Sequence, residues 1–229
     1  MLVLVLDSST PAVTAALAEV TDGIRLLASR CTVDARAHGE LLSPQIVACL
    51  AEAGVTPSDL AAVVAGLGPG PFTGLRVGLV TAASLAHALD IPAYGVNSLD
   101  ALGLAASGAD SGTTRPVLAA TDARRREIYW AVYAADGSRI TEPAVATPAV
   151  VADALAGLGV TEAVGDGALR YADVLGVPVR PEPRYPDALR MAELAADRIR
   201  RGTPGEPLTP CYLRRPDAVA STTRKPVLR

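Results

Sequence analysis

Runs of apolar residues alternate with short polar turns in a pattern that occurs twice along the chain. An all-apolar run at 2–6, typical of a strand buried on both faces, leads into a polar turn and a second apolar strand. The Asp22-Gly23 pair that follows is a strong hairpin signal. The same order returns at 117–120, with a hairpin signal at Asp136-Gly137. We therefore predict two similar α/β lobes, each opening with a strand meander, although two hairpins can resemble each other by chance.

The remaining segments predict helices between further strands. A stripe at helical spacing predicts a helix over 40–53 that ends at Gly54; it consists of Leu41, Leu42, Gln45, Ile46, Cys49, Leu50 and Ala53. We predict other helices at 75–89, 99–106, 148–158, 169–175 and 188–201. The other strands are expected at 13–20, 24–33, 60–65, 93–96 and 127–134, near Ala163, and from Arg139 onward.

A small, polar, glycine-rich stretch at 108–116 is the best candidate linker. It divides the chain into a first lobe at 1–107, expected to carry the dimer contact, and a second lobe at 117–229. From Gly202 the chain is rich in proline and arginine, which predicts an extended C-terminal strap.

Composition narrows the classes of function. The chain has 229 residues, a formal net charge of −3 and a sequence pI of about 5.4. A nucleic-acid binder normally carries a basic surface, which a net charge of −3 does not indicate. If the chain serves a reaction on RNA, a partner is expected to supply most of the RNA-binding affinity. Three distant cysteines fit a reducing cytoplasm, and we expect a cytoplasmic protein. The apolar N-terminus lacks a basic start and resembles a strand, and we expect no membrane span.

Two loops are candidates for binding phosphate. The glycine-proline loop at 66–74 has no lysine for a P-loop and the wrong spacing for a dinucleotide site. Gly68 and Gly70 would still allow close backbone approach to a phosphate, against the alternative of a rigid structural turn. Asp7, Ser8 and Thr10 could hold a nucleotide phosphate and its magnesium, but they are also ordinary turn residues.

Several stretches together resemble one protein family. They are Asp7-Ser8-Ser9-Thr10, the glycine loop continued to Gly78, Asp122-Ala123-Arg124 with Glu127-Ile128-Tyr129, and Tyr212-Leu213-Arg214. This combination resembles the TsaB family, formerly YeaZ, a bacterial subunit required to make threonylcarbamoyladenosine beside the tRNA anticodon. Family members usually have serine where Pro71 stands, which makes a phosphate role at that position less expected.

The resemblance implies the actin-like, sugar-kinase-like ATPase fold and a catalytic relative, TsaD. The metal site of TsaD uses a segment of the form Asn-His-Met-Glu-Gly-His, and the corresponding stretch here is 97–102. Its two histidine positions hold Ser98 and Leu102, which are poor metal ligands. We therefore expect no metal and no catalytic residue in this chain. His38 and His87 form no ligand pair either, and a metallopeptidase is improbable.

The expected role is that of a non-catalytic partner subunit. The resemblance implies contacts with TsaD, with the TsaE ATPase and with a second copy of the chain, and contact with tRNA only through the complex. It implies no cofactor of its own, with ATP or ADP confined to a joint interface. The predicted interface residues lie on the helices at 40–53 and 75–89 and are Leu42, Ile46, Cys49, Val77, Gly78, Thr81, Ser84 and Leu85.

Two alternatives stay open at this point. The chain could be a nucleotide-dependent phosphotransferase of the same superfold, with Asp7 and Thr10 around magnesium phosphate. Arg124-Arg125-Arg126 and the basic tail could touch tRNA or an acidic partner, although solvated turns are the favoured interpretation; the tail residues are Arg214, Arg215, Arg224, Lys225 and Arg229.

Overall fold

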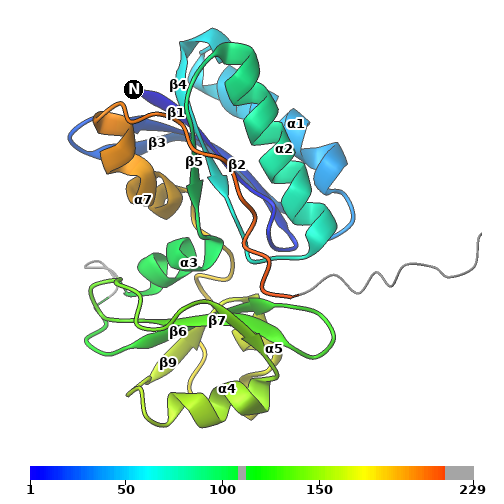
Figure 1. Cartoon of the computed structure of the whole chain (residues 1–229), viewed down its shortest axis with the longest axis vertical. Coiled ribbons are helices and arrows are strands. Elements are labelled where there is room, and N and C mark those ends of the chain that lie inside the picture. Colours follow the sequence, from blue (N-terminus) through cyan, green and yellow to red (C-terminus); the bar gives the residue numbers. More distant parts are fainter. Residues whose placement is uncertain (108–111, 215–229) are drawn as a thin grey trace, which may run out of the picture.

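The computed structural model describes residues 1–107 and 112–214 and shows two α/β lobes (Figure 1). Part of the predicted linker, at 108–111, lies outside the described residues, and so does the end of the predicted strap at 215–229 with Arg215, Arg224, Lys225 and Arg229.

The first lobe is a five-stranded sheet with the order β3-β2-β1-β4-β5. Strands β1 (Leu2–Asp7), β2 (Ala12–Val20) and β3 (Ile24–Val33) form the predicted antiparallel meander, and β4 (Leu60–Gly66) and β5 (Ala93–Val96) add in parallel. Helices α1 (His38–Ala53) and α2 (Phe72–Leu89) cover one face. A single 3-10 turn, η1 (Pro57–Asp59), precedes β4.

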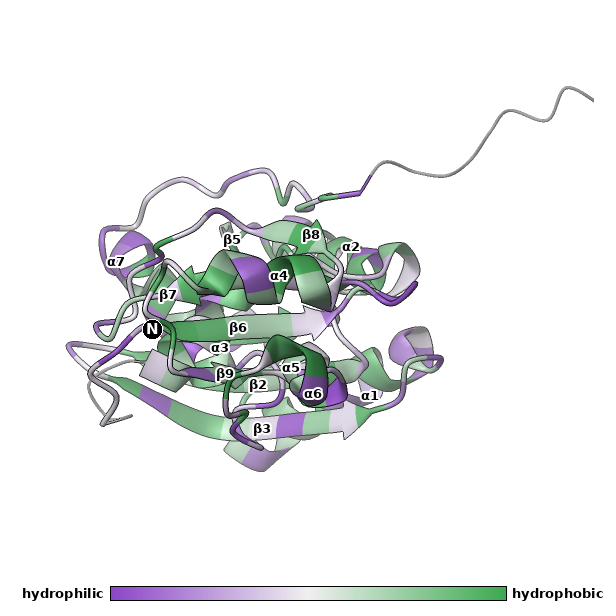
Figure 2. Ribbon diagram, turned by 90° about the horizontal axis from the view of Figure 1, so that it is seen from below, coloured by the Kyte–Doolittle hydropathy of each residue, from purple (hydrophilic) through white to green (hydrophobic). Residues whose placement is uncertain are grey.

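The second lobe repeats this plan in smaller form, with the sheet order β8-β7-β6-β9. Strand β6 (Val117–Asp122) pairs antiparallel with β7 (Ile128–Tyr133) and parallel with β9 (Glu162–Val164), as β1 pairs with β2 and β4. Figure 2 shows β6 apolar along most of its length, as a central strand buried on both faces requires, whereas β3 also carries hydrophilic positions. Two similar lobes are therefore confirmed.

Helices cover both faces of the second sheet. Helix α3 (Ser98–Ser107) packs on the face towards the first lobe, with Leu99, Leu102 and Ala106 in its core. The opposite face carries α4 (Pro148–Leu155), α5 (Asp166–Arg170) and α6 (Ala172–Leu175). The helix predicted at 148–158 thus ends earlier, and the one predicted at 169–175 is divided in two.

The third strand of the second meander differs from the prediction. Arg139 makes only an isolated bridge to Tyr133, and the strand β8 follows at Ala144–Ala146. The sequence between them contains Pro143 and polar residues, which do not extend a ladder.

Helix α7 (Ala188–Arg200) was assigned with the second lobe but packs on the first sheet. Its buried face, formed by Met191, Ala192 and Ala195, contacts Val3 and Val5 on the side of the sheet opposite α1 and α2. The reason is geometric: that face of the sheet would otherwise be exposed, and burial of its apolar residues stabilises the lobe. The chain therefore returns to the first lobe before its end.

The strap after α7 runs along the edge of β5 and then to the second lobe. Glu206 donates its backbone N–H to the Ala93 carbonyl (3.0 Å), and Cys211 donates to the Leu67 carbonyl (2.8 Å). Arg214 then donates to the Ala123 carbonyl (3.0 Å) and pairs with Glu127. The strap covers the open edge of the sheet and joins the two lobes.

Helix α2 is the one helix among the described residues that is long and apolar enough to cross a membrane. Its buried residues Leu75, Leu79 and Ala82 pack on the first sheet. Because a core helix meets the same criteria, this is weak support for a span, and the expectation of no membrane contact stays a prediction.

Candidate functional site

The Asp7 carboxylate lies at the carboxyl end of β1, and each of its two oxygens accepts a hydrogen bond from the chain itself. Its Oδ1 accepts hydrogen bonds from the backbone N–H (3.0 Å) and the hydroxyl (2.9 Å) of Ser9. Its Oδ2 accepts from the Ser98 hydroxyl at 2.6 Å. Asp7 is only 1% exposed, and this burial raises the pKa of its carboxyl above the usual value for aspartate.

The hydroxyls of the same turn also serve the fold. The Ser8 hydroxyl donates to the Gly74 carbonyl (2.8 Å) and accepts from the Gly78 N–H (2.9 Å), which ties the turn to α2. Thr10 Oγ1 accepts from the Ala12 N–H, and the Thr10 carbonyl lies 2.8 Å from His38 Nε2. The side-chain oxygens of Asp7, Ser8 and Thr10 therefore all take part in hydrogen bonds within the chain.

The glycine-proline loop fills the space beside this turn. A methyl group at Gly70 would come within 2.0 Å of the Ser9 carbonyl oxygen, and one at Gly66 within 1.8 Å of Asp7 Oδ2. The glycines permit close approach, as expected, but the backbone they admit is that of the chain itself. The loop is also shorter than predicted: α2 begins at Phe72 rather than at Leu75, and its N-cap is Pro71, which makes no side-chain hydrogen bond.

The cavity that remains here is too small for a nucleotide. It measures about 30 Å³, roughly the volume of one water molecule, and is lined by Ser8, Thr10, Pro11, Ala35, His38, Pro71, Gly74 and Arg124. Neither Asp7 nor Gly68 and Gly70 line it. The residues of the phosphotransferase alternative are thus brought together, but without room for phosphate and magnesium between them.

Ser98 and Leu102, which the family resemblance places at the metal-ligand positions of TsaD, are likewise engaged within the chain. The Ser98 hydroxyl donates to Asp7 and accepts from the Gly68 N–H (3.2 Å), and Leu102 is fully buried in the apolar core. In the described ranges, no three His, Cys, Asp or Glu side chains are grouped so that they could hold a metal ion.

A second polar site lies between the lobes. Asp122 is buried, accepts a hydrogen bond from Arg170 (2.9 Å), and lies 3.8 Å from Arg124. Asp166 accepts from the Asp122 N–H (3.2 Å), and its burial raises the pKa of its carboxyl to about 6. The cavity here measures about 480 Å³ and is lined from both lobes by Pro11, Val33, Ala35, Asp122, Arg124, Asp166, Leu169, Arg170, Arg184 and Tyr185.

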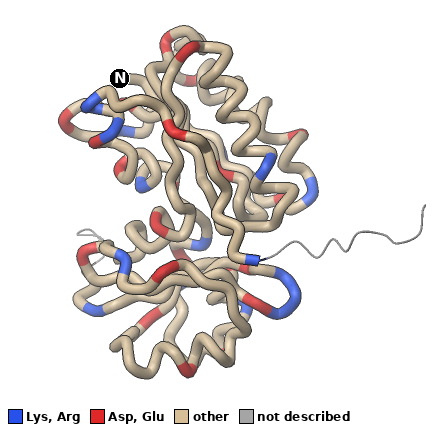
Figure 3. Tube along the Cα trace, viewed as in Figure 1, with Lys and Arg blue, Asp and Glu red and all other residues tan. Residues whose placement is uncertain are grey.

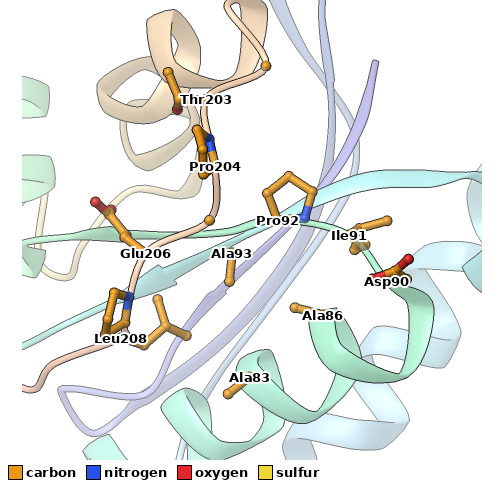
Figure 4. Close-up of a pocket in the computed structure, with 13 residues that line it drawn as sticks. Ala83, Ala86, Asp90, Ile91, Pro92, Ala93, Thr203, Pro204, Glu206 and Leu208 are labelled. Carbon is orange, nitrogen blue, oxygen red and sulfur yellow. The ribbon is translucent and has the colours of Figure 1, made fainter.

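Another cavity, of about 560 Å³, lies between the end of α2, the start of β5 and the strap (Figure 4). Its walls are mostly alanine, proline and backbone, with Ala83, Ala86, Pro92 and Pro204 among them. The carboxylate of Glu206 accepts from the Gly95 N–H (2.8 Å) and pairs with Arg198. This cavity offers little chemistry for a ligand.

The outer face of α2 carries exposed apolar side chains beside a shallow groove. Val80 is 63% exposed and Phe72 is 45% exposed, and a shallow groove there is lined by Phe72, Thr73, Arg76, Val77, Val80 and Thr81. Val77, Thr81, Ser84 and Leu85 from the predicted interface are at least partly exposed on this helix.

Four of the predicted interface residues lie inside the lobe instead. Leu42, Ile46 and Cys49 belong to the core between α1 and the sheet, and the Cys49 thiol donates to the Ala15 carbonyl. Gly78 packs on the Ser8 hydroxyl, which a methyl group would approach to 2.4 Å. The apolar stripe of α1 faces the sheet, and Gly78 lies on the side of α2 that faces Ser8, so neither set is available to a partner.

An aromatic cluster at the start of α2 is not predicted by the sequence pattern. The Phe72 and Tyr212 rings stack with centroids 5.2 Å apart, and the Arg76 guanidinium lies 3.6 Å from the Phe72 ring centroid. Arg76 Nε also donates to the Tyr212 hydroxyl at 2.9 Å. Tyr212-Leu213-Arg214 was noted only as part of the family resemblance, and its distance of over 130 residues from Phe72 hides the contact.

Comparison with known proteins gives a consistent result. A family model described as TsaD, tRNA N6-adenosine threonylcarbamoyltransferase, matches residues 31–198. An uncharacterized protein of Mycobacterium tuberculosis is 48% identical over 94% of this chain and 93% of its own. The tRNA threonylcarbamoyladenosine biosynthesis protein TsaB of Escherichia coli is 37% identical over 61% of this chain and 58% of its own.

Solved structures agree with these relatives. The structure of YeaZ from Pseudomonas aeruginosa has a TM-score of 0.76 and 31% identity, and the match covers 93% of this chain and 99% of that one. A polyphosphate/ATP-glucomannokinase from Arthrobacter, at 16% identity and a TM-score of 0.51, covering 86% of this chain and 98% of its own, shows the sugar-kinase-like fold alone. The predicted actin-like, sugar-kinase-like ATPase fold is therefore confirmed, and the chain belongs to the TsaB (YeaZ) family, within the wider family that TsaD represents.

Proposed function

We propose that this chain is a non-catalytic partner subunit in the formation of threonylcarbamoyladenosine in tRNA, acting in the cytoplasm. The names of its relatives support the pathway, and the closed Asp7 turn supports the absence of catalysis. A phosphotransferase of this fold needs an open carboxylate beside magnesium phosphate, whereas both oxygens of Asp7 are bonded to the chain itself. The closed turn is the observation that carries the proposal.

The exposed face of α2 is the proposed contact for partners. Interfaces are enriched in aromatic residues and arginine around apolar contacts, and Phe72, Arg76, Val80 and Tyr212 provide that combination. We propose that a second copy of the chain and the TsaD-type catalytic subunit compete for this face. In the mixed complex, contact with this chain orders the catalytic subunit. TsaE, and any ATP or ADP, bind only to the assembled complex.

Reconstitution tests the proposal. Formation of the modified nucleoside is measured with the catalytic subunit and the adenylate-forming enzyme, with and without this chain. We expect product only when the chain is present. An equal yield without the chain would contradict the proposal.

The Asp7→Asn variant separates the partner subunit from the phosphotransferase alternative. Asparagine has the size of aspartate and can accept from Ser9 while donating to Ser98, so the turn should persist. We expect product formation within about twofold of wild type, because a carboxylate that only shapes a turn is replaceable. Loss of product from a folded, complex-forming variant, together with ATP and magnesium binding by the wild-type chain in calorimetry, would favour the enzyme.

The exchange of partners is tested by size-exclusion chromatography with light scattering. Adding the catalytic subunit should convert the homodimer into a mixed complex. A homodimer that persists within the complex through the same face would contradict the competition.

A further inference from the structure

The loop between β6 and β7 carries three consecutive arginines in an unusual backbone conformation. Arg124, Arg125 and Arg126 have φ angles of +59°, +55° and +63°, a left-handed region that costs roughly 1–2 kcal/mol per residue for side chains other than glycine. All three side chains are exposed. Figure 3 shows this loop as the longest unbroken basic stretch of the described chain.

Two further arginines extend this positive surface across both lobes. Arg170 on α5 is half-exposed and bonds to Asp122 beside Arg124. Ala35, the chain neighbour of Arg36, lines two cavities together with Arg124, so the loop after β3 faces the arginine loop. We call these five residues the arginine surface: Arg36, Arg124, Arg125, Arg126 and Arg170.

The neighbouring acids, Asp34, Asp122 and Asp166, are fewer than the five arginines and offset only part of this charge. Asp122 is buried beneath Arg124 and Arg170, and Glu127 pairs with Arg214 from the strap. Asp34 accepts a hydrogen bond from the Arg36 backbone N–H. The surface is therefore basic on a chain whose net charge is −3, so charge has been concentrated at one place.

The arginine surface also adjoins the proposed partner face. Tyr212 of the strap stacks on Phe72 at the start of α2, and two residues later Arg214 bonds to the Ala123 carbonyl in the arginine loop. An RNA held by a catalytic subunit on α2 would therefore lie within reach of these arginines.

We propose that the arginine surface binds the phosphodiester backbone of the tRNA while this chain is bound to the catalytic subunit. Guanidinium groups match phosphate oxygens in geometry, and contacts to phosphate position an RNA without reading its sequence. The rest of the chain is acidic and would repel RNA, so contact with the RNA is confined to the arginine surface. The inference rests on the proposed function and adds a direct RNA contact to it.

The test measures tRNA affinity of the assembled complex against salt concentration, by fluorescence anisotropy with labelled tRNA. The variant is Arg124→Asn with Arg126→Asn, because asparagine tolerates the left-handed backbone. The slope of log affinity against log salt should fall by roughly 0.7–0.9 for each phosphate that the variant no longer neutralises. We expect about tenfold weaker binding at about 100 mM salt and a comparable decrease in product at subsaturating tRNA.

The matched control is Arg25→Asn with Arg30→Asn, the same change of charge on exposed residues of β3. We expect its salt slope to stay that of wild type. An unchanged slope in the loop variant, or an equal fall in the control, would overturn the proposal. So would a loop variant that no longer binds the catalytic subunit, since the loop would then contact protein. If the wild-type chain does not promote modification at all, the proposed function fails first, and the two failures are distinguished.

Discussion

The two faces of helix α2 differ: one is packed closely against the turn after β1, and the other exposes apolar side chains to solvent. Towards β1, Gly74 and Gly78 bring the helix backbone against Ser8, and the side-chain oxygens of Asp7, Ser8 and Thr10 form hydrogen bonds within the chain. Away from the sheet, Phe72 and Val80 present apolar side chains to solvent. The turn after β1 is thus closed by the chain itself, whereas the outer face of α2 is exposed. The proposed role of a partner subunit requires both features, a closed turn on one side of the helix and an exposed surface on the other.

The largest expected effect comes from adding a side chain where the glycine-proline loop packs against the Asp7 turn. In Gly70→Ala, the new methyl group would lie 2.0 Å from the Ser9 carbonyl oxygen, and neither backbone can easily move. We expect the free energy of unfolding to fall by about 3 kcal/mol or more in urea denaturation.

The control for that variant is Gly39→Ala, at the start of α1, where a methyl group meets nothing within 4 Å. Alanine there should stabilise the protein by about 0.5–1 kcal/mol. A decrease below about 1 kcal/mol in Gly70→Ala would mean that the turn can open, and the contrast between the two faces would weaken.

The open side is tested by placing a charge in it. Val80→Asp should weaken homodimer formation and catalytic-subunit binding about 100-fold, because a carboxylate would be buried without a partner. Light scattering and calorimetry measure both contacts. Val150→Asp on α4 is the matched control, since that valine is 58% exposed on the second lobe, and it should leave both contacts unchanged. Equal association of the two variants would exclude the α2 face as the interface.

Most elements of the first lobe were predictable from the sequence, and the orientation of the helices was not. The strands at 2–6, 13–20 and 24–33 and the helix at 40–53 are confirmed because period and turn signals are local. Four predicted interface residues are buried: Leu42, Ile46 and Cys49 on the sheet-facing stripe of α1, and Gly78 on α2. On α2, Leu79 is buried and its neighbour Val80 is exposed, although both are apolar. In such a helix, periodicity alone does not distinguish the core face from the outer face.

Long-range contacts account for the other differences. The amphipathic pattern of α7 predicts a helix correctly, but which sheet it covers depends on packing between segments almost 190 residues apart. The residues of the Asp7 turn were identified as candidates, whereas its closure depends on Gly66, Gly70 and Ser98 from elsewhere in the chain. Sequence patterns show which groups carry chemistry, and only the packed structure shows whether they are accessible.

The buried carboxyl of Asp166 in the second lobe should make the free energy of unfolding depend on pH. Burial raises the pKa of Asp166 to about 6, so the folded state holds this proton more tightly than the unfolded state, where the pKa is about 4. Stability from this group is present below about pH 4 and is lost as pH rises to about 6. In wild type, this group should lower the free energy of unfolding by an amount on the order of 2 kcal/mol between about pH 4 and pH 6. The Asp166→Asn variant should lack that decrease, as measured by urea denaturation at the two pH values.

The control for the pH measurement is Asp153→Asn, which removes an exposed carboxylate on α4. We expect its pH dependence to follow that of wild type. If Asp166→Asn follows wild type as well, the carboxyl of Asp166 is solvated in the folded protein, and the site between the lobes is more open than the Asp7 turn.

The smallest effect concerns the strap, where the closed and open regions meet. Tyr212→Leu removes the stack on Phe72 and the hydrogen bond from Arg76, and should cost about 1 kcal/mol in the free energy of unfolding. Tyr212→Phe keeps the stack and removes only an exposed hydrogen bond, so its cost should be about 0.5 kcal/mol. If the two variants cost the same, the ring contributes nothing beyond its hydroxyl. If Tyr212→Leu in addition weakens partner binding while Tyr212→Phe does not, the strap is part of the partner face, since only the ring then matters to the contact.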